Sequence, residues 1–226
     1  PSSEAPFRTR VVVNRPVDDR DFNGTVVVEW LNVSGGADAS PDWMHTHVEL
    51  IRRGYAWVGV SAQAVGLNGL KGAPPQGDAE RYASLTHPGD SYSYDMFSQA
   101  GQAIRDHADL VLGGLQPDHL IAAGESQSAG RLVTYIDAVH PLVGVYDAFL
   151  VHSRGAGGAA LSQAPLPVVS SPLPTLIRGD LDVPVLVFNT ETDAGSLQAR
   201  QPDSPNYRLW EVAGTAHFDQ YGLMTG

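Results

Sequence analysis

A serine lies at the junction of two regular elements in the segment Gly124-Glu125-Ser126-Gln127-Ser128. An apolar run at residues 119–123 precedes it, and a helical pattern at residues 129–139 follows it. A sharp turn from a strand to a helix lifts a serine hydroxyl clear of the sheet, and the N–H of Gln127 then faces a developing oxyanion. The segment therefore predicts that Ser126 is a nucleophile. The alternative is that Ser126 or Ser128 only caps the helix, because the usual pattern has a glycine where Ser128 stands.

A serine nucleophile needs a base, and the base needs a carboxylate that orients it. The sequence offers them in the order serine, acid, histidine, because residues 183–188 read as a strand that runs into Glu191 and Asp193 and residues 207–212 as a strand that runs into His217. We expect His217 to be the base; the alternative is an ordinary surface histidine. Asp193 is favoured as the acid and Glu191 is the alternative. The carboxylate that is not used would stabilise the turn.

An oxyanion requires a second N–H donor besides that of Gln127. Where a serine occupies such a strand-to-helix turn, this donor comes from the loop before the first helix. That loop contains Val33 and Ser34, followed by Gly35-Gly36, whose lack of side chains lets the backbone approach a ligand closely. We expect the N–H of Val33 or Ser34 to be the donor. The alternative is that the two glycines form only a flexible turn.

Seven apolar runs rich in β-branched residues read as strands and alternate with helical patterns. The strands are expected at residues 9–13, 25–30, 55–60, 119–123, 146–151, 183–188 and 207–212, and the helices between Ser40-Pro41-Asp42 and Arg52-Arg53-Gly54, at about 93–112 and at 129–139. This alternation predicts one α/β domain over residues 1–226, with a mostly parallel central sheet, helices on both faces and functional residues beyond the carboxyl ends of the strands. Because the chain ends soon after His217, we expect a C-terminal helix to be missing.

Residues 155–182 are rich in proline and glycine and lie where a lid is often inserted. Aliphatic side chains would give this lid-like segment an apolar underside and favour a substrate with an apolar portion; they are Leu161, Leu166, Val168, Val169 and Leu173. The alternative is a packed surface loop whose leucines belong to the core. His152 and Arg154 follow a strand at the same edge, and we expect them to bind substrate, with Arg154 holding a carboxylate. The alternative for Arg154 is an ion pair with an acidic loop residue.

The composition excludes several classes of function. The chain has 226 residues, a net charge of −11 and no cysteine, so disulfides, thiolate catalysis and cysteine-ligated zinc are excluded. The negative charge opposes binding to nucleic acid or anionic membranes, and we identify no basic patch that would overcome it. No apolar run approaches the roughly 20 residues of a membrane span, and residues 1–6 lack a signal-peptide core. We therefore expect a soluble protein that is either cytoplasmic or secreted after removal of a signal.

Five segments are long and unusual enough to compare with known families. They are VEWLNVSGG (residues 28–36), VGVSAQ (58–63), HPGDSYSYD (87–95), GESQS (124–128) and WEVAGTAH (210–217). Together they resemble a bacterial group of serine hydrolases, the alpha/beta hydrolase domain proteins, over nearly the whole chain. The resemblance implies an α/β-hydrolase fold in which Ser126 is the nucleophile and His217 the base. It does not distinguish Glu191 from Asp193, and it implies a reaction class without a substrate.

The sequence as a whole predicts a serine hydrolase that cleaves carboxylic esters through an acyl-enzyme on Ser126. We expect a small ester with an apolar portion as substrate and no cofactor or metal. The same residue types would also serve an acyltransferase, a thioesterase or an amidase. A non-catalytic binding protein that keeps the fold is the alternative from another class.

Overall fold

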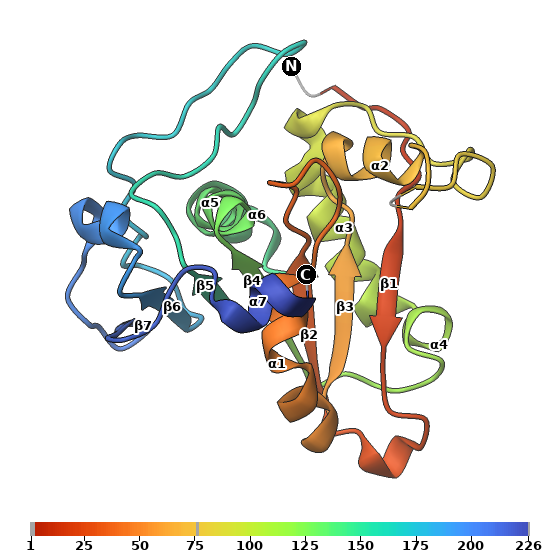
Figure 1. Ribbon diagram of the computed structural model, residues 1–226, viewed down its shortest axis with the longest axis horizontal. Helices are drawn as coiled ribbons and strands as arrows, with labels where there is room; N and C mark the ends of the chain where they lie inside the picture. Colours follow the sequence, from red (N-terminus) through yellow and green to blue (C-terminus); the bar gives the residue numbers. More distant parts are fainter. Residues whose placement is uncertain (1–2, 76, 226) are drawn as a thin grey trace.

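The computed structural model describes residues 3–75 and 77–225. Within them, seven strands form one sheet in the order β1-β3-β2-β4-β5-β6-β7 (Figure 1). β1 is antiparallel to β3, and all other neighbours are parallel. The strands are β1 (Val11–Asn14), β2 (Thr25–Trp30), β3 (Ala56–Val60), β4 (His119–Glu125), β5 (Ala148–His152), β6 (Val185–Thr190) and β7 (Tyr207–Val212). The predicted mostly parallel sheet is confirmed.

Helices cover both faces of this sheet. Successive residues of a strand point to opposite faces, so each strand contacts helices on both sides. Trp30 of β2 points to one face and packs on Phe97 of α3, with ring centroids 4.8 Å apart. Glu29 points to the other face and meets the start of α1. α5 packs on β4 and β5, and α7 packs on α1 (Figure 1). The helices named here are α1 (Pro41–Arg52), α3 (Ser93–Asp106), α5 (Gln127–Thr134) and α7 (Gln220–Thr225). Across the described residues, none of the helices combines the length and the apolar run needed to cross a bilayer.

Two predicted helices are irregular in the structure. The helix expected at 93–112 is divided into α3 and α4 (Ala108–Val111), because the backbone of His107 leaves the helical region at φ −133° and ψ 41°. The helix expected at 129–139 begins at Gln127, passes through a π-helical stretch at Tyr135–Val139 and continues as α6 (His140–Val143). Pro141 lies in the first turn of α6, where its missing N–H has no cost.

A short helix, α2 (Ala64–Leu70), lies in a stretch where neither a helix nor a strand was expected. Gly66 and Gly69 interrupt its apolar pattern and are poor helix formers, which hides the helix from periodicity. Gly66 is required by packing, since a Cβ there would lie 1.8 Å from Oδ1 of Asp38. Tertiary contact thus overrides the local preference.

The proline-rich segment 155–182 runs as an extended loop outside α5 (Figure 1). It is attached to α5 by hydrogen bonds from the Ala159 N–H to the Gly130 carbonyl and from the Thr134 hydroxyl to the Ala159 carbonyl. Leu161 packs against the core, whereas Val168 and Leu173 are 67% and 75% exposed. The predicted lid with an apolar underside is therefore not confirmed, because these side chains face solvent or the core.

A buried carboxylate on β2 holds the first turn of α1. Glu29 is 0% exposed and accepts hydrogen bonds from the N–H groups of Asp42 (3.0 Å) and Trp43 (2.9 Å) and from Nε1 of Trp57 (2.8 Å). Ser40, which precedes the helix, makes no side-chain capping bond. Burial, with the Asp42 carboxylate nearby, raises the pKa of Glu29 well above its usual value. The start of α1 was predicted correctly, but its cap comes from a strand.

The variant Glu29→Leu is expected to lower the free energy of unfolding by roughly 3 kcal/mol or more, because it leaves three buried donors without an acceptor. Urea unfolding measures this difference. The control is Glu49→Leu near the other end of α1, where the side chain is 49% exposed and the expected change stays within about 0.5 kcal/mol. Equal losses for the two variants would contradict the capping role of Glu29.

Candidate active site

Ser126 lies on a tight turn between β4 and α5. Its backbone has φ 57° and ψ −111°, a left-handed conformation that is unfavourable for a residue with a side chain. Ser128 closes the turn: its hydroxyl donates to the Glu125 carbonyl (2.8 Å) and accepts from the Glu125 N–H (3.0 Å). A Cβ at Gly124 would lie 3.0 Å from the Ser128 carbonyl oxygen, so that position has little room for a side chain. Ser128 thus explains how the turn forms without the usual second glycine.

Three side chains from three loops form one chain of hydrogen bonds. The Ser126 Oγ lies 2.8 Å from Nε2 of His217, and Nδ1 of His217 lies 2.6 Å from Oδ1 of Asp193. These residues follow β4, β7 and β6, whose carboxyl ends meet at one edge of the sheet. An Nδ1–H that donates to Asp193 leaves the Nε2 lone pair free to accept the serine proton.

Asp193, and not Glu191, contacts His217. The Asp193 side chain is 5% exposed, and its Oδ2 accepts hydrogen bonds from the N–H (2.7 Å) and the hydroxyl (2.8 Å) of Thr190. Burial alone would raise the pKa of the Asp193 carboxyl, but the hydrogen bonds from Thr190 and His217 outweigh it and hold that pKa below its usual value. Glu191 is exposed and accepts the Gly214 N–H at 2.5 Å, so it holds the two loops together.

The two expected oxyanion donors differ in availability. The Ser34 N–H is engaged by Oδ1 of Asn32 at 2.8 Å, in a local turn of the asparagine. The Val33 N–H meets Oε1 of Gln127 through a longer contact of 3.3 Å. The Gln127 N–H is the first of α5, where no intrahelical acceptor exists. Of the two loop amides, that of Val33 is the one whose acceptor a ligand oxygen can more easily replace.

Buried side chains fix the orientation of the Gln127 amide. The Trp30 indole N–H, which can only donate, points at Oε1 of Gln63 (3.1 Å). The Gln127 Nε2 then donates to the same oxygen at 2.9 Å, which leaves the Gln127 Oε1 facing Val33. These buried contacts therefore determine that Gln127 presents its Oε1 to the loop that contains Val33.

Glu125, the residue before Ser126, brings a second carboxylate to His217. Its Oε1 lies 3.4 Å from Nε2 of His217, and its Oε2 accepts from Nδ2 of Asn32 at 3.2 Å. Glu125 was not among the site residues expected from the sequence, although it lies within the segment Gly124–Ser128. Its position beside the serine was the available signal, but an exposed side chain was equally compatible with that position.

The two residues expected to bind substrate are engaged by other protein groups, and of the two Arg154 borders the smaller cavity beside Ser126. The His152 Nδ1 lies 2.8 Å from Oδ1 of Asp42, and the ring packs on Phe188. Arg154 is 2% exposed, and its guanidinium donates to the carbonyls of Gly155 (3.0 Å) and Thr175 (2.6 Å). The guanidinium thus anchors the base of the 155–182 loop, and no acidic partner is found for it among the described residues.

Ser126 lies between two cavities of unequal size and chemistry. The larger, about 900 Å³, extends along α1 toward α7 and is lined by apolar side chains that include Trp43, Met44 and Phe218. The smaller, about 420 Å³, is bordered by Ser153, Thr192 and the triad-forming loops. Of segment 155–182, only Gly155 reaches a cavity beside Ser126 among the described residues. The apolar space at the site therefore comes from α1 and the C-terminal segment.

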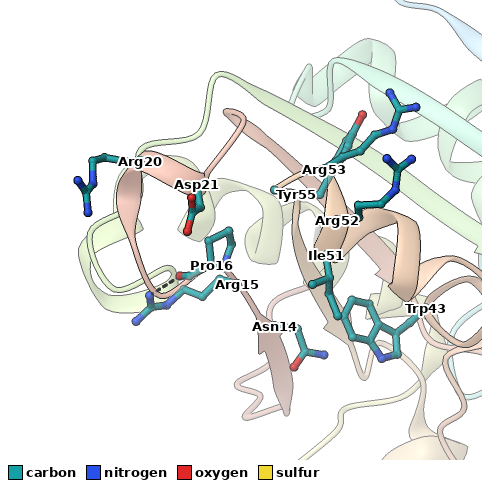
Figure 2. Close-up of a pocket in the computed structure, with 11 residues that line it drawn as sticks. Asn14, Arg15, Pro16, Arg20, Asp21, Trp43, Ile51, Arg52, Arg53 and Tyr55 are labelled. Carbon is teal, nitrogen blue, oxygen red and sulfur yellow. Dashed lines mark hydrogen bonds between the residues drawn. The ribbon is translucent and has the colours of Figure 1, made fainter.

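A third cavity, about 680 Å³, lies at the opposite edge of the sheet (Figure 2). Figure 2 shows that the guanidinium groups of Arg20, Arg52 and Arg53 turn outward around it. Arg20 pairs with Asp18, and the other two pair with Glu49. Paired and solvent-exposed arginines leave little charge for a ligand, and Arg15 donates to the Pro16 carbonyl. The parallel strand β3 begins beside this cavity, and the antiparallel strand β1 ends there. The cavity is therefore separate from the candidate site.

We expect Asp193→Asn to slow labelling of Ser126 by a fluorophosphonate by about 10³-fold or more, because the amide cannot hold His217 in the required tautomer. Intact-mass analysis at timed intervals measures the rate. Glu191→Gln is the matched control, and its rate is expected to stay within about threefold of the parent, since Glu191 does not contact His217. A larger loss in the Glu191 variant would reverse the assignment of the acid.

The comparisons with known proteins agree with this fold. The family model for the alpha/beta hydrolase domain matches residues 1–225. A serine hydrolase without lid from Xanthomonas campestris superposes with a TM-score of 0.51 at 16% identity, covering 99% of this chain and 91% of the other. Esterase 2 from Thermogutta terrifontis, phosphonylated by cyclosarin, gives a TM-score of 0.50 at 16% identity, covering 92% and 79%. None of the curated proteins matches. The chain belongs to the alpha/beta hydrolase domain family.

Proposed function

We propose that the protein hydrolyses carboxylic esters through an acyl-enzyme on Ser126. The observation that carries the proposal is the continuous hydrogen-bond chain from Ser126 through His217 to Asp193, with distances of 2.8 and 2.6 Å. This geometry activates a hydroxyl that would otherwise be a weak nucleophile. It needs no cofactor, because the three side chains supply the nucleophile, the base and the orienting charge.

In the first half-reaction, Oγ of Ser126 attacks the acyl carbon while its proton moves to Nε2 of His217. The tetrahedral intermediate then collapses: the bond to the leaving oxygen breaks, and the same proton passes from Nε2 to that oxygen, releasing the alcohol. In the second half-reaction, a water molecule gives a proton to Nε2 and attacks the acyl carbon. Collapse returns the proton to Oγ and releases the acid.

The oxyanion would be bound by the N–H groups of Gln127 and Val33. For Val33 to take part, the ester oxygen must replace the 3.3 Å contact to the Gln127 side chain. Loss of one such donor typically costs roughly 2.7–4 kcal/mol of barrier, or about 10²- to 10³-fold in rate. The exchange is therefore favourable in the transition state, when the charge on the oxygen is greatest.

Acyl transfer and cleavage of thioesters or amides use the same three groups. They differ in the acceptor or in the leaving group, which the triad does not define. Added alcohols that divert product from acid to new ester would indicate a transferase. A non-catalytic binding protein would retain the fold without an activated Ser126.

The larger cavity supports a substrate with a bulky apolar portion. At about 25 cal/mol per Å² of buried apolar area, an aromatic ring placed there contributes on the order of 2–3 kcal/mol. The 420 Å³ cavity suits a smaller group. We therefore propose an ester that is bulky and apolar on one side and small on the other.

The first test is exposure of the protein to a fluorophosphonate, followed by intact-mass analysis. We expect a single adduct on the parent and none on Ser126→Ala, because only an activated hydroxyl reacts. A panel of esters then measures hydrolysis. A folded parent that gives no adduct would favour the binding protein over the hydrolase.

The cavity is tested by Met44→Trp, which narrows it. We expect kcat/KM for 1-naphthyl acetate to fall roughly 10- to 100-fold, with ethyl acetate nearly unaffected, because only the bulky ester needs the space. The control is Val48→Trp, whose side chain is 68% exposed on the same helix. Unchanged selectivity in Met44→Trp would place the bulky group elsewhere.

A further inference from the structure

Glu125 occupies a position that the serine, histidine and aspartate do not explain. Its side chain is 10% exposed and reaches His217 from the serine side, with Oε1 3.4 Å from Nε2. Asn32 holds the residue from below by donating from Nδ2 to both the backbone carbonyl (3.0 Å) and Oε2 (3.2 Å) of Glu125. One asparagine thus fixes the position of this carboxylate relative to the histidine.

The charged neighbours of Glu125 come from four other elements. His217 follows β7, Asp193 follows β6, His152 ends β5, and Asp42 lies in α1. Burial raises the pKa of Glu125 to about 7; His217 and His152 oppose this rise, and Asp42 and Asp193 add to it. Glu125 therefore changes its charge within the range in which a histidine base operates.

The two charge states of Glu125 have different effects on Nε2 of His217. A protonated Glu125 can donate its proton to the Nε2 lone pair, which Ser126 must use. An ionised Glu125 has no proton to donate, so the lone pair stays available to Ser126. Once His217 has taken the serine proton, the ionised carboxylate attracts the imidazolium.

We propose that ionised Glu125 is a second positioning carboxylate for His217, which stabilises the imidazolium from its Nε2 side while Asp193 holds Nδ1. The proposal rests on the proposed function, because the imidazolium forms only during acyl transfer. No proton moves to Glu125 in this scheme. The Nε2 proton still passes to the leaving oxygen, and Glu125 keeps its charge throughout.

The test compares the parent with Glu125→Gln, which keeps the shape and removes the charge. We measure kcat/KM for p-nitrophenyl acetate from about pH 6 to about pH 9. The ratio of parent to variant is expected to rise about tenfold or more as the pH passes through about 7, because only the parent gains a carboxylate there. A ratio that stays constant across this range would assign Glu125 a purely structural role and overturn the proposal.

Two matched variants separate charge from shape. Glu125→Asp keeps the charge on a shorter side chain, and we expect it to retain the pH-dependent rise with a lower rate. Glu191→Gln removes an exposed carboxylate of the neighbouring loop, and its ratio to the parent is expected to be independent of pH. If Glu125→Asp lost the rise, or Glu191→Gln reproduced it, the proposal would be wrong.

Stability gives a measurement that does not need activity. A carboxyl whose pKa is raised from 4.5 to about 7 in the folded state binds protons more tightly when folded. The parent must therefore lose stability relative to Glu125→Gln as the pH rises from about 4.5 to about 7. An equal pH dependence of unfolding in both proteins would contradict the raised pKa of Glu125, on which the expected rise of the rate ratio near pH 7 depends. Fluorophosphonate labelling of the parent is the separate test of the hydrolase function, so the two ideas can fail independently.

Discussion

The left-handed backbone of Ser126 is the constraint on which the site depends. A residue with a side chain in such a conformation costs on the order of 1–3 kcal/mol, which the surrounding structure must offset. Ser128 fixes the far side of the turn through Glu125, and the Ser126 N–H donates to the His152 carbonyl in the adjacent strand at 2.9 Å. The position of the hydroxyl is therefore set by the sheet and by α5. The loops that carry His217 and Asp193 need only bring these side chains to the Ser126 hydroxyl, whose position is already set.

Buried carboxylates are a second feature of the region around the candidate site. Glu29 is met by backbone and indole N–H groups, Asp42 by His152, Glu125 by Asn32 and Asp193 by Thr190. No arginine or lysine contacts any of them in the described part of the chain. Most of the donors to these carboxylates are neutral amide, indole and hydroxyl groups. Burial raises the pKa of Glu29 and of Glu125, because its effect exceeds the gain from the groups that favour the charged carboxylate.

Much of this arrangement was predictable because it depends on local patterns. The strands are near-continuous apolar runs, and Ser126 and His217 each lie just beyond one of them. The helix α2 was not predicted, because Gly66 is a poor helix former. A glycine is found there because of its close contact with Asp38. The apolar underside predicted for residues 155–182 was not confirmed, because an aliphatic residue in a loop carries no information about which surface it faces.

The sequence by itself determined the α/β alternation, the order of the serine, acid and histidine, and the turn that carries the nucleophile. These follow from periodicity and from residue types at the ends of strands, which are local properties. Only the tertiary structure placed Asp193 rather than Glu191 against His217, engaged the Ser34 N–H with Asn32, and brought Glu125 to His217. Each of these choices depends on where two distant loops meet. One or two residues along a chain are enough to turn a side chain toward the site or toward solvent.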